Sequence, residues 1–536
     1  MVPHPKTRSR PRHPRVRRRL SLGLALAAAT LVATVGCGLG SSESNSSAKG
    51  PRHGGSLTIL LPGEERGLDP FTASYSNVAD GNRLSALYDV LVWTDPTTGG
   101  VHPKLAESLV SDQSAKVWTL TLREGVKFSD GSLLDAATVK ANWEAHRNPE
   151  VRSLVGGVLR DVVLTEVAPL QLRIELPSSN ANFDHTVARN LSFVAPKRLV
   201  ATPDGRFELK HAPIGAGPYK LKEWLPGREL RLERNPDYWQ KDRPYLDEVV
   251  FRVDKDVEGA NKAIQAKKAD LTITTDAQNI AAAREMGLVG EDSRLNGGLM
   301  VAFNTRKPPF QDPAARRAVV LGLSGAEIDR RYFGGRGNSA QGIFDSRSPL
   351  ANINLSAPEN RPEEARALFA KLTNDGKKPF VFRYLVPDSP KPRQVAEYIR
   401  QTLEQYPAVT VIVEVADMAS LVTRASGNDF DSTVFQLWAD DVEPTIYQFL
   451  HSKGGLSNVT GYANDIVDAA LEDGRRYTDA ASRRDAYTRL QNQVNRDLPY
   501  WVYSEAVSAS VHRPDLIGIQ LFNDGLIHFD AIGLRP

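Results

Sequence analysis

The 536-residue sequence contains one cysteine, Cys37, so no disulfide can form within the chain. No histidine lies in an H-E-x-x-H pattern or in a His/Cys cluster, which argues against a zinc site. The G-x-S-x-G turn of serine hydrolases and the G-x-x-x-x-G-K-[ST] phosphate loop are both absent. The glycine-rich residues 334–337 lack a strand-to-helix context and read as an ordinary loop. We therefore predict no metal, no cofactor and no enzymatic activity.

Long hydrophobic runs are also missing, with one exception at Leu20–Val35. Its sixteen residues are fewer than the roughly 20 that a membrane-spanning helix needs. Residues 1–36 carry eight Lys or Arg and no acid, and the pattern predicts a signal peptide over 1–36. Without those eight charges the formal net charge of +3 becomes about −5. A mildly acidic body argues against a nucleic-acid partner, which would select a basic face.

The single cysteine follows this leader directly. Thr34-Val35-Gly36-Cys37 resembles the lipobox of bacterial lipoproteins, although Thr34 stands where leucine is typical. The resemblance implies that Cys37 is lipidated and that the acyl chains hold the protein to the extracytoplasmic face of the cell membrane. The Ser/Gly-rich residues 37–54 then read as a flexible tether.

One stretch combines features of a ligand site. A short apolar strand at 430–435 leads into Trp438, followed by Asp440, Asp441 and Pro444. Because ligands bind where strands leave the sheet of an α/β domain, the carboxylates can pair with a cationic group and the indole can cover apolar atoms. The alternative is structural: the indole belongs to the core and the acids cap the next helix, predicted over Thr445–Leu450.

Strand and helix patterns alternate over the second half of the chain. Phe380–Leu385 and Val409–Val415 are apolar strand patterns, and a helical pattern at Arg393–Leu403 lies between them. This order predicts a βαβ unit with parallel strands and a right-handed crossover. Asp312 followed by proline predicts a helix start, and residues 498–503 form a further apolar strand. The fold class predicted from these elements is α/β.

Several short motifs occur in the order that is typical of one family. They are G-L-D-P at 67–70, L-Y-D-V-L-V at 87–92, P-K-L-A-E-S at 103–108, L-R-E-G-V-K-F-S-D-G at 122–131, I-G-A-G-P-Y at 214–219, L-E-R-N-P-D-Y-W at 232–239, F-N-T-R at 303–306 and W-A-D at 438–440. With these motifs, the chain resembles the family 5 extracellular solute-binding proteins of ABC importers. It departs from the family pattern at Ser129, often histidine, and at 111–116, which lack the usual turn.

The resemblance implies a two-lobed periplasmic-binding-protein-like fold with an extra subdomain on the first lobe. It places lobe I at 55–90 with 205–300 and 504–536, the extra subdomain at 91–204 and lobe II at 301–503. Hinges are expected near Met300–Asn304 and Pro499–Tyr503, because chain segments that pass between lobes absorb the backbone rotation of closure.

The resemblance also implies a function. The protein would bind peptides, or a peptide-like solute, and deliver them to the permease subunits of an ABC importer, acting as a monomer. In peptide-binding relatives the first acid of this motif pairs with the ligand's α-ammonium, which implies that role for Asp440. Trp438 would line the same pocket, and Asp441 is the weaker candidate because its side chain points the other way. The alternatives are another solute (a nickel chelate, a sugar or an antibiotic), a cell-envelope regulator with this fold, and an exported enzyme.

Overall fold

The computed structural model describes residues 50–63, 67–153, 155–335 and 339–536. The predicted signal peptide, Cys37 and most of the predicted tether lie outside the described residues. The last residues of the tether segment are fixed rather than free. The backbone N–H of Arg52 donates to the carbonyl of Leu534, and that of Gly54 donates to the carbonyl of Tyr245.

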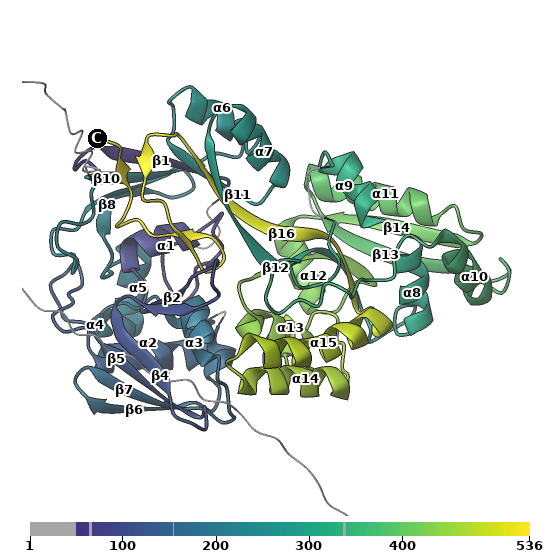
Figure 1. Cartoon of the computed structure of the whole chain (residues 1–536), viewed down its shortest axis with the longest axis horizontal. Helices are drawn as coiled ribbons and strands as arrows, with labels where there is room; N and C mark the ends of the chain where they lie inside the picture. The colour runs from purple at the N-terminus through teal and green to yellow at the C-terminus, as the bar shows by residue number, and fades with distance from the viewer. Residues whose placement is uncertain (1–49, 64–66, 154, 336–338) are drawn as a thin grey trace, which may run out of the picture. The chain divides into compact units, whose positions relative to one another are not determined.

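A ten-stranded sheet organises the described chain. Its strand order is β14-β13-β15-β12-β16-β11-β1-β10-β9-β8. The two long strands β12 (Val289–Phe303) and β16 (Tyr500–His512) pair antiparallel near its middle. Figure 1 shows them running side by side from the β1 and β11 part of the sheet to the β13 and β14 part. The buried residues of β1 and β11 beside one end of the β12–β16 pair contribute to one hydrophobic core, and the residues at the other end of the pair belong to two further cores.

The first part of the sheet uses strands from the N-terminal half. Its members are β1 (Ser56–Leu61), β8 (Tyr219–Leu225), β9 (Glu229–Arg234), β10 (Glu248–Val253) and β11 (Leu271–Thr274). β1 lies parallel to β10 and β11, and its alternate residues Leu57, Ile59 and Leu61 are fully buried. Helix α1 (Gly81–Tyr88) packs into the same core, and α6 (Ala260–Gln265) and α7 (Ala277–Glu285) follow nearby strands.

A second, four-stranded sheet forms from residues between 106 and 175. Its order is β4 (Ala106–Ser111), β5 (Val117–Leu122), β7 (Gln171–Glu175) and β6 (Val163–Ala168), all antiparallel. Helix α2 (Ala136–Arg147) shares its core, and the buried Trp143 lies there. The Asp135 carboxylate caps this helix, because it accepts from the Thr138 N–H at 2.7 Å. This cluster is separate from the core around β1.

The predicted βαβ unit is confirmed. β13 (Phe380–Pro387) pairs parallel with β14 (Val409–Ala416), and α11 (Pro390–Leu403) connects them. Helix α8 (Pro313–Leu321) begins after Asp312, whose side chain accepts from the Ala314 N–H. The predicted α/β fold class is also confirmed. In the part of the chain that the structure describes, no helix is both long and apolar enough to cross a membrane.

Two predicted elements differ in extent. The strand predicted at 430–435 is β15 (Ser432–Ala439), which runs on through Trp438 along β12. The following helical segment starts at Val442 rather than Thr445, as the turn η4 (Val442–Ile446) and helix α13 (Tyr447–Leu450). It starts earlier because the Asp441 side chain caps it, accepting from the Glu443 N–H at 3.0 Å. Helices α14 (Asp465–Arg476) and α15 (Ala480–Asp497) then lead to β16.

Candidate ligand-binding site

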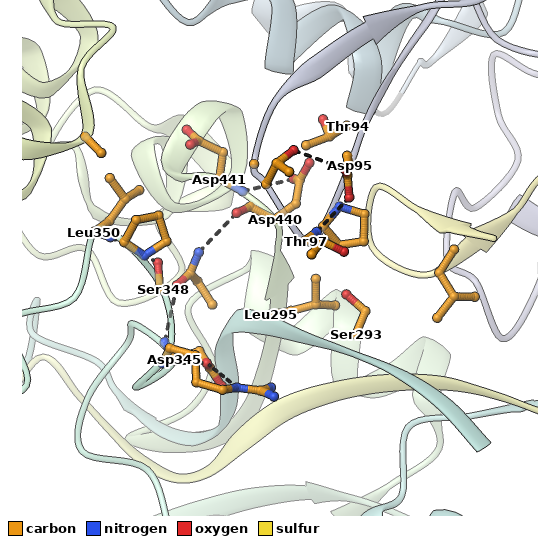
Figure 2. A pocket seen from close by; sticks show the side chains of 18 of the residues that line it. Thr94, Asp95, Thr97, Ser293, Leu295, Asp345, Ser348, Leu350, Asp440 and Asp441 are labelled. Carbon is orange, nitrogen blue, oxygen red and sulfur yellow. Dashed lines mark hydrogen bonds and ion pairs between the residues drawn. The ribbon is translucent and has the colours of Figure 1, made fainter. Parts of the chain in front are cut away.

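A cavity of about 720 Å³ lies where several distant segments meet. Its walls come from the 94–99 loop, residues 291–296 of β12, the 345–350 loop, Asp440 and Asp441 after β15, the start of α15, and residues 519–521. Figure 2 shows Asp440 and Asp441 on one side of this space and Asp345 and Ser348 on another. A volume of this size accommodates a small organic ligand.

Asp440 lies just after the end of β15, where the chain bends out of the sheet. One oxygen of its carboxylate, Oδ1, accepts from the Asp441 N–H at 3.0 Å. The other, Oδ2, is buried and accepts no hydrogen bond from any described residue. A buried carboxylate oxygen without a partner is unfavourable, so this oxygen is prepared to accept from a positively charged donor.

An asparagine joins Asp440 to a second carboxylate on the opposite wall. The Asn296 side chain donates from Nδ2 to the Asp440 carbonyl and accepts at Oδ1 from the Asp345 N–H, each at 3.2 Å. Asp345 is 4% exposed, and its Oδ2 accepts no hydrogen bond from the described residues. Its Oδ1 accepts from the Arg347 N–H at 2.9 Å and lies 3.3 Å from Arg347 Nε. Both walls of the cavity therefore carry a carboxylate with one unpaired oxygen.

Asp441 has a different environment although it is the next residue. Both of its carboxylate oxygens accept from the Arg483 guanidinium, at 2.6 and 2.8 Å, and His185 Nε2 lies 3.9 Å away. Burial opposes ionisation of Asp441, but the attraction of Arg483 and then His185 outweighs it and holds its pKa well below the usual range. Since these oxygens are already occupied, Asp441 forms the wall of the cavity.

Glu443, two residues after Asp441, is also buried. Its Oε1 lies 2.9 Å from Arg475 Nε, and its Oε2 accepts from Asn180 at 3.4 Å. Burial raises the pKa of Glu443, and the nearby Arg475 opposes that increase. The Glu443 carboxylate therefore links α14 to the segment that contains Asn180.

A further arginine approaches Asp440 from the segment between β7 and α4 (Lys197–Val200). Arg189 forms an ion pair with Asp524, whose carboxylate also accepts from the Asp440 N–H at 3.2 Å. Burial lowers the pKa of Arg189, and the attraction of Asp440 partly offsets this decrease. One guanidinium therefore lies close to two carboxylates, and it pairs with Asp524.

Trp438 lines a different cavity, of about 400 Å³. That cavity is largely apolar, with Leu299, Phe333, Val434 and Tyr503 among its walls. The indole Nε1 is buried and donates no hydrogen bond to a described residue. The sequence predicted Trp438 and Asp440 on one side of a strand, but β15 ends at Ala439. Strand alternation therefore does not extend to Asp440, and the two side chains reach separate cavities.

Sequence reasoning did not find Asp345, Asn296 or Arg189. Asp345 lies in a loop, G-I-F-D-S-R-S-P, with no pattern of its own. It reaches the site because the Gly297 N–H donates to the Ile343 carbonyl, which fixes the loop beside β12. Within the described residues, no group of three or more His, Cys, Asp or Glu side chains is arranged to hold a metal ion.

Comparisons with known proteins agree with this architecture. Residues 100–457 match the family described as bacterial extracellular solute-binding proteins, family 5 Middle. The chain is 26% identical over 492 residues to the oligopeptide-binding protein AppA of Bacillus subtilis (strain 168), covering 85% of this chain and 88% of AppA.

Two solved structures show the same fold. AppA from Bacillus subtilis in complex with a nonapeptide superposes with a TM-score of 0.78 at 22% identity, covering 91% of this chain and all of that one. NikA from Brucella suis in complex with Fe(III)-EDTA gives a TM-score of 0.75 at 22% identity, covering 89% and 98%. Because the family match spans more than half of its length, the chain belongs to the family 5 extracellular solute-binding proteins. The predicted two-lobed binding-protein fold is confirmed.

Proposed function

We propose that this protein captures peptides outside the cytoplasm, as a lipid-anchored component that delivers them to the permease of an ABC importer. Family membership supports the solute-binding role, and the similarity to an oligopeptide-binding protein supports peptides as the solute. The protein acts as a monomer and carries out no chemical conversion. Its partner ATPase supplies the energy of transport.

The observation that carries the peptide assignment is the carboxylate of Asp440. Its Oδ2 is buried, unpaired among the described residues, and belongs to a residue in the wall of the cavity. An α-ammonium group that donates to this oxygen would satisfy it, and the low local dielectric strengthens such an ion pair. Asp441 supports the site from behind through Arg483. Trp438 contributes from the neighbouring apolar cavity, which suits the side chain of a longer peptide.

The proposed domain division follows the family order. Lobe I comprises 55–90, 205–300 and 504–536, the extra subdomain 91–204, and lobe II 301–503. The cavity takes residues from all three parts, as expected for a ligand enclosed by lobe closure.

Cys37 carries the lipid anchor, and replacing it by alanine should release the protein from the membrane fraction. An unchanged membrane fraction would contradict the anchor.

Calorimetry with di- to hexapeptides tests the function. We expect the wild type to bind peptides with a free N-terminus and to bind their N-acetylated forms much more weakly. Asp440→Asn should reduce affinity for the free peptides by roughly ten- to hundred-fold, because a charge-assisted hydrogen bond is lost. The peptides should be recovered intact by mass spectrometry. Equal binding of free and acetylated peptides, or no binding of either, would contradict the proposal.

A different solute is the second candidate, because NikA shares this fold and its structure holds Fe(III)-EDTA. Mass spectrometry of any small molecule that co-purifies with the protein separates the two candidates. A regulator would bind its ligand without any loss of peptide uptake when the gene is deleted. If Asp440→Asn lowers thermal stability but leaves peptide affinity unchanged, the role of Asp440 is structural.

A further inference from the structure

The charge of the large cavity is unbalanced. Two guanidinium groups, those of Arg347 and Arg483, line it. Six carboxylates line it as well: Asp95, Glu291, Asp292, Asp345, Asp440 and Asp441. Such an excess of one sign focuses the electrostatic potential inside a cavity and favours ligands of the opposite charge. The six carboxylates differ in whether the protein already supplies partners for their oxygens.

Four of the six carboxylates already interact with other groups of the protein. Their partners are Arg483 for Asp441, Arg284 for Asp292, His512 at 3.8 Å for Glu291, and the hydrogen bonds from Thr97 and Thr98 for Asp95. Asp441 and Asp292 are thereby neutralised by an arginine, and Asp95 accepts hydrogen bonds from neutral groups.

The two that remain are Asp440 and Asp345. Each has one oxygen, Oδ2, that is buried and accepts no hydrogen bond from the described residues. Arg347 does not donate to Oδ2 of Asp345, because its guanidinium approaches Oδ1 and its side chain is 62% exposed. Arg189, the cation beside Asp440, is paired with Asp524. Two oxygens of this kind in one polar cavity need two donors.

A single side chain bridges Asp440 and Asp345. One amide group, that of Asn296, hydrogen-bonds to the backbone of both. The Asp345 loop is fixed in the same place by the bond between Gly297 and Ile343. A ligand whose α-ammonium binds at Asp440 therefore has Asp345 within reach of a side chain near its N-terminus.

From this arrangement we infer that the site selects ligands with two positive charges: a peptide whose α-ammonium pairs with Asp440 and whose lysine or arginine side chain, in the first or second position, pairs with Asp345. This inference rests on the proposed function, and it narrows the solute to basic peptides. Asp345 would be the residue that determines this preference. A guanidinium or ammonium group supplies the donors that Oδ2 of Asp345 does not find within the described protein.

The test uses calorimetry with matched tripeptides. The set is Lys-Ala-Ala, Ala-Lys-Ala and Ala-Ala-Ala, together with the two lysine peptides acetylated at Nε. We expect the wild type to bind one of the lysine peptides at least ten-fold more tightly than its Nε-acetylated form. Asp345→Asn keeps an oxygen for the Arg347 N–H and should abolish this preference, so that each lysine peptide and its Nε-acetylated form bind with equal affinity. Asp440→Asn should weaken all five peptides.

The matched control is Asp95→Asn, which removes one negative charge from the same cavity at a carboxylate that is already hydrogen-bonded. It should retain the lysine preference. If Asp95→Asn and Asp345→Asn reduce the preference equally, the effect is long-range and the inference fails. The inference also fails if the wild type binds all tripeptides equally through Asp440, although the proposed function then stands. Binding of no peptide, or of Ca²⁺ alone with loss in Asp345→Asn, overturns both.

Discussion

Asp440 and Asp441 are neighbours in the chain, but their surroundings differ completely. Asp441 has an arginine on both oxygens, while Asp440 has one oxygen without a partner among the described residues. The partner of Asp441 comes from α15, 42 residues later. Two adjacent acids can therefore differ in role: Asp441 stabilises the wall, and Asp440 is the residue proposed to bind the ligand.

Asp441→Asn should destabilise the protein by about 3–5 kcal/mol at neutral pH, because it leaves the Arg483 charge buried without its partner. Asparagine still caps η4, so the change isolates the charge. Urea unfolding of the two proteins measures the difference. Asp485→Asn, an exposed carboxylate on the same helix as Arg483, is the control and should change stability by less than about 0.5 kcal/mol.

The same pair predicts a pH dependence. Because Arg483 and His185 hold the pKa of Asp441 below its value in the unfolded chain despite burial, its contribution to stability is complete above about pH 4. That contribution is lost as the pH falls toward the folded-state pKa. The gap between wild type and Asp441→Asn should therefore narrow below about pH 4. A gap that stays constant down to pH 2 would contradict the assignment.

Only some residues of the candidate site could be predicted from the sequence. Asp440 and Asp441 could be found because they follow a strand and belong to a motif. Asp345 and Asn296 could not, because their roles come from contacts between segments 49 residues apart or more. Neither the loop nor its neighbours differ in composition from an ordinary surface turn.

At the scale of elements, β12 has one unusual place. Its pairing with β16 is irregular between Leu295 and Met300, and Gly297 and Gly298 have φ values of 105° and 124°. Residues before this point pair only with β16, and residues from Asn296 onward pair with β15. The irregularity lies just before the hinge predicted at Met300–Asn304, and a change of backbone angles there would tilt the parts joined by β12.

Gly298→Ala should be strongly destabilising, by roughly 1–3 kcal/mol or more. A Cβ at this position would lie 2.1 Å from the Ser504 carbonyl oxygen, and the φ value disfavours any side chain. Thermal unfolding measures the loss. The control is Gly342→Ala, where a Cβ meets no atom within 4 Å and φ is not in the left-handed region. Equal stability of the two variants would show that β12 can relax here.

Local elements followed from the sequence more closely than long ones did. The N-cap at Asp312 and the βαβ unit of β13, α11 and β14 depend on neighbouring residues, and both were predicted. The pattern at 498–503 showed only the start of β16, which continues to His512. Its second half contains V-S-A-S-V, which was not predicted as a strand although apolar and polar residues alternate in it, and all five of these residues are buried.

At the scale of the whole described chain, the segment around 180–185 contacts the α14–α15 region directly. Asn182 Nδ2 donates to the carbonyls of Gly474, Arg475 and Tyr477 at 3.0–3.4 Å, and the Ala181 N–H donates to the Arg475 carbonyl at 2.7 Å. Asn180 also reaches Glu443. In the proposed domain division these bonds join the extra subdomain to lobe II, so opening the lobes must break them.

Asn182→Ala should therefore shift the ligand-free protein toward an open state. The substitution removes the hydrogen bonds that the Asn182 side chain donates to three carbonyls of the proposed lobe II, and it changes no residue of the large cavity's wall. Small-angle scattering should give a larger radius of gyration for the ligand-free variant than for the wild type. A saturating peptide should bring both proteins to the same radius of gyration. The apparent affinity should be weaker in the variant, because closure now requires more of the binding free energy.

The control is Asn261→Ala, a buried asparagine whose side chain donates to the Asn279 carbonyl within proposed lobe I. It should lower stability without changing the radius. If Asn182→Ala and the wild type scatter identically with and without ligand, the 180–185 contacts do not govern closure.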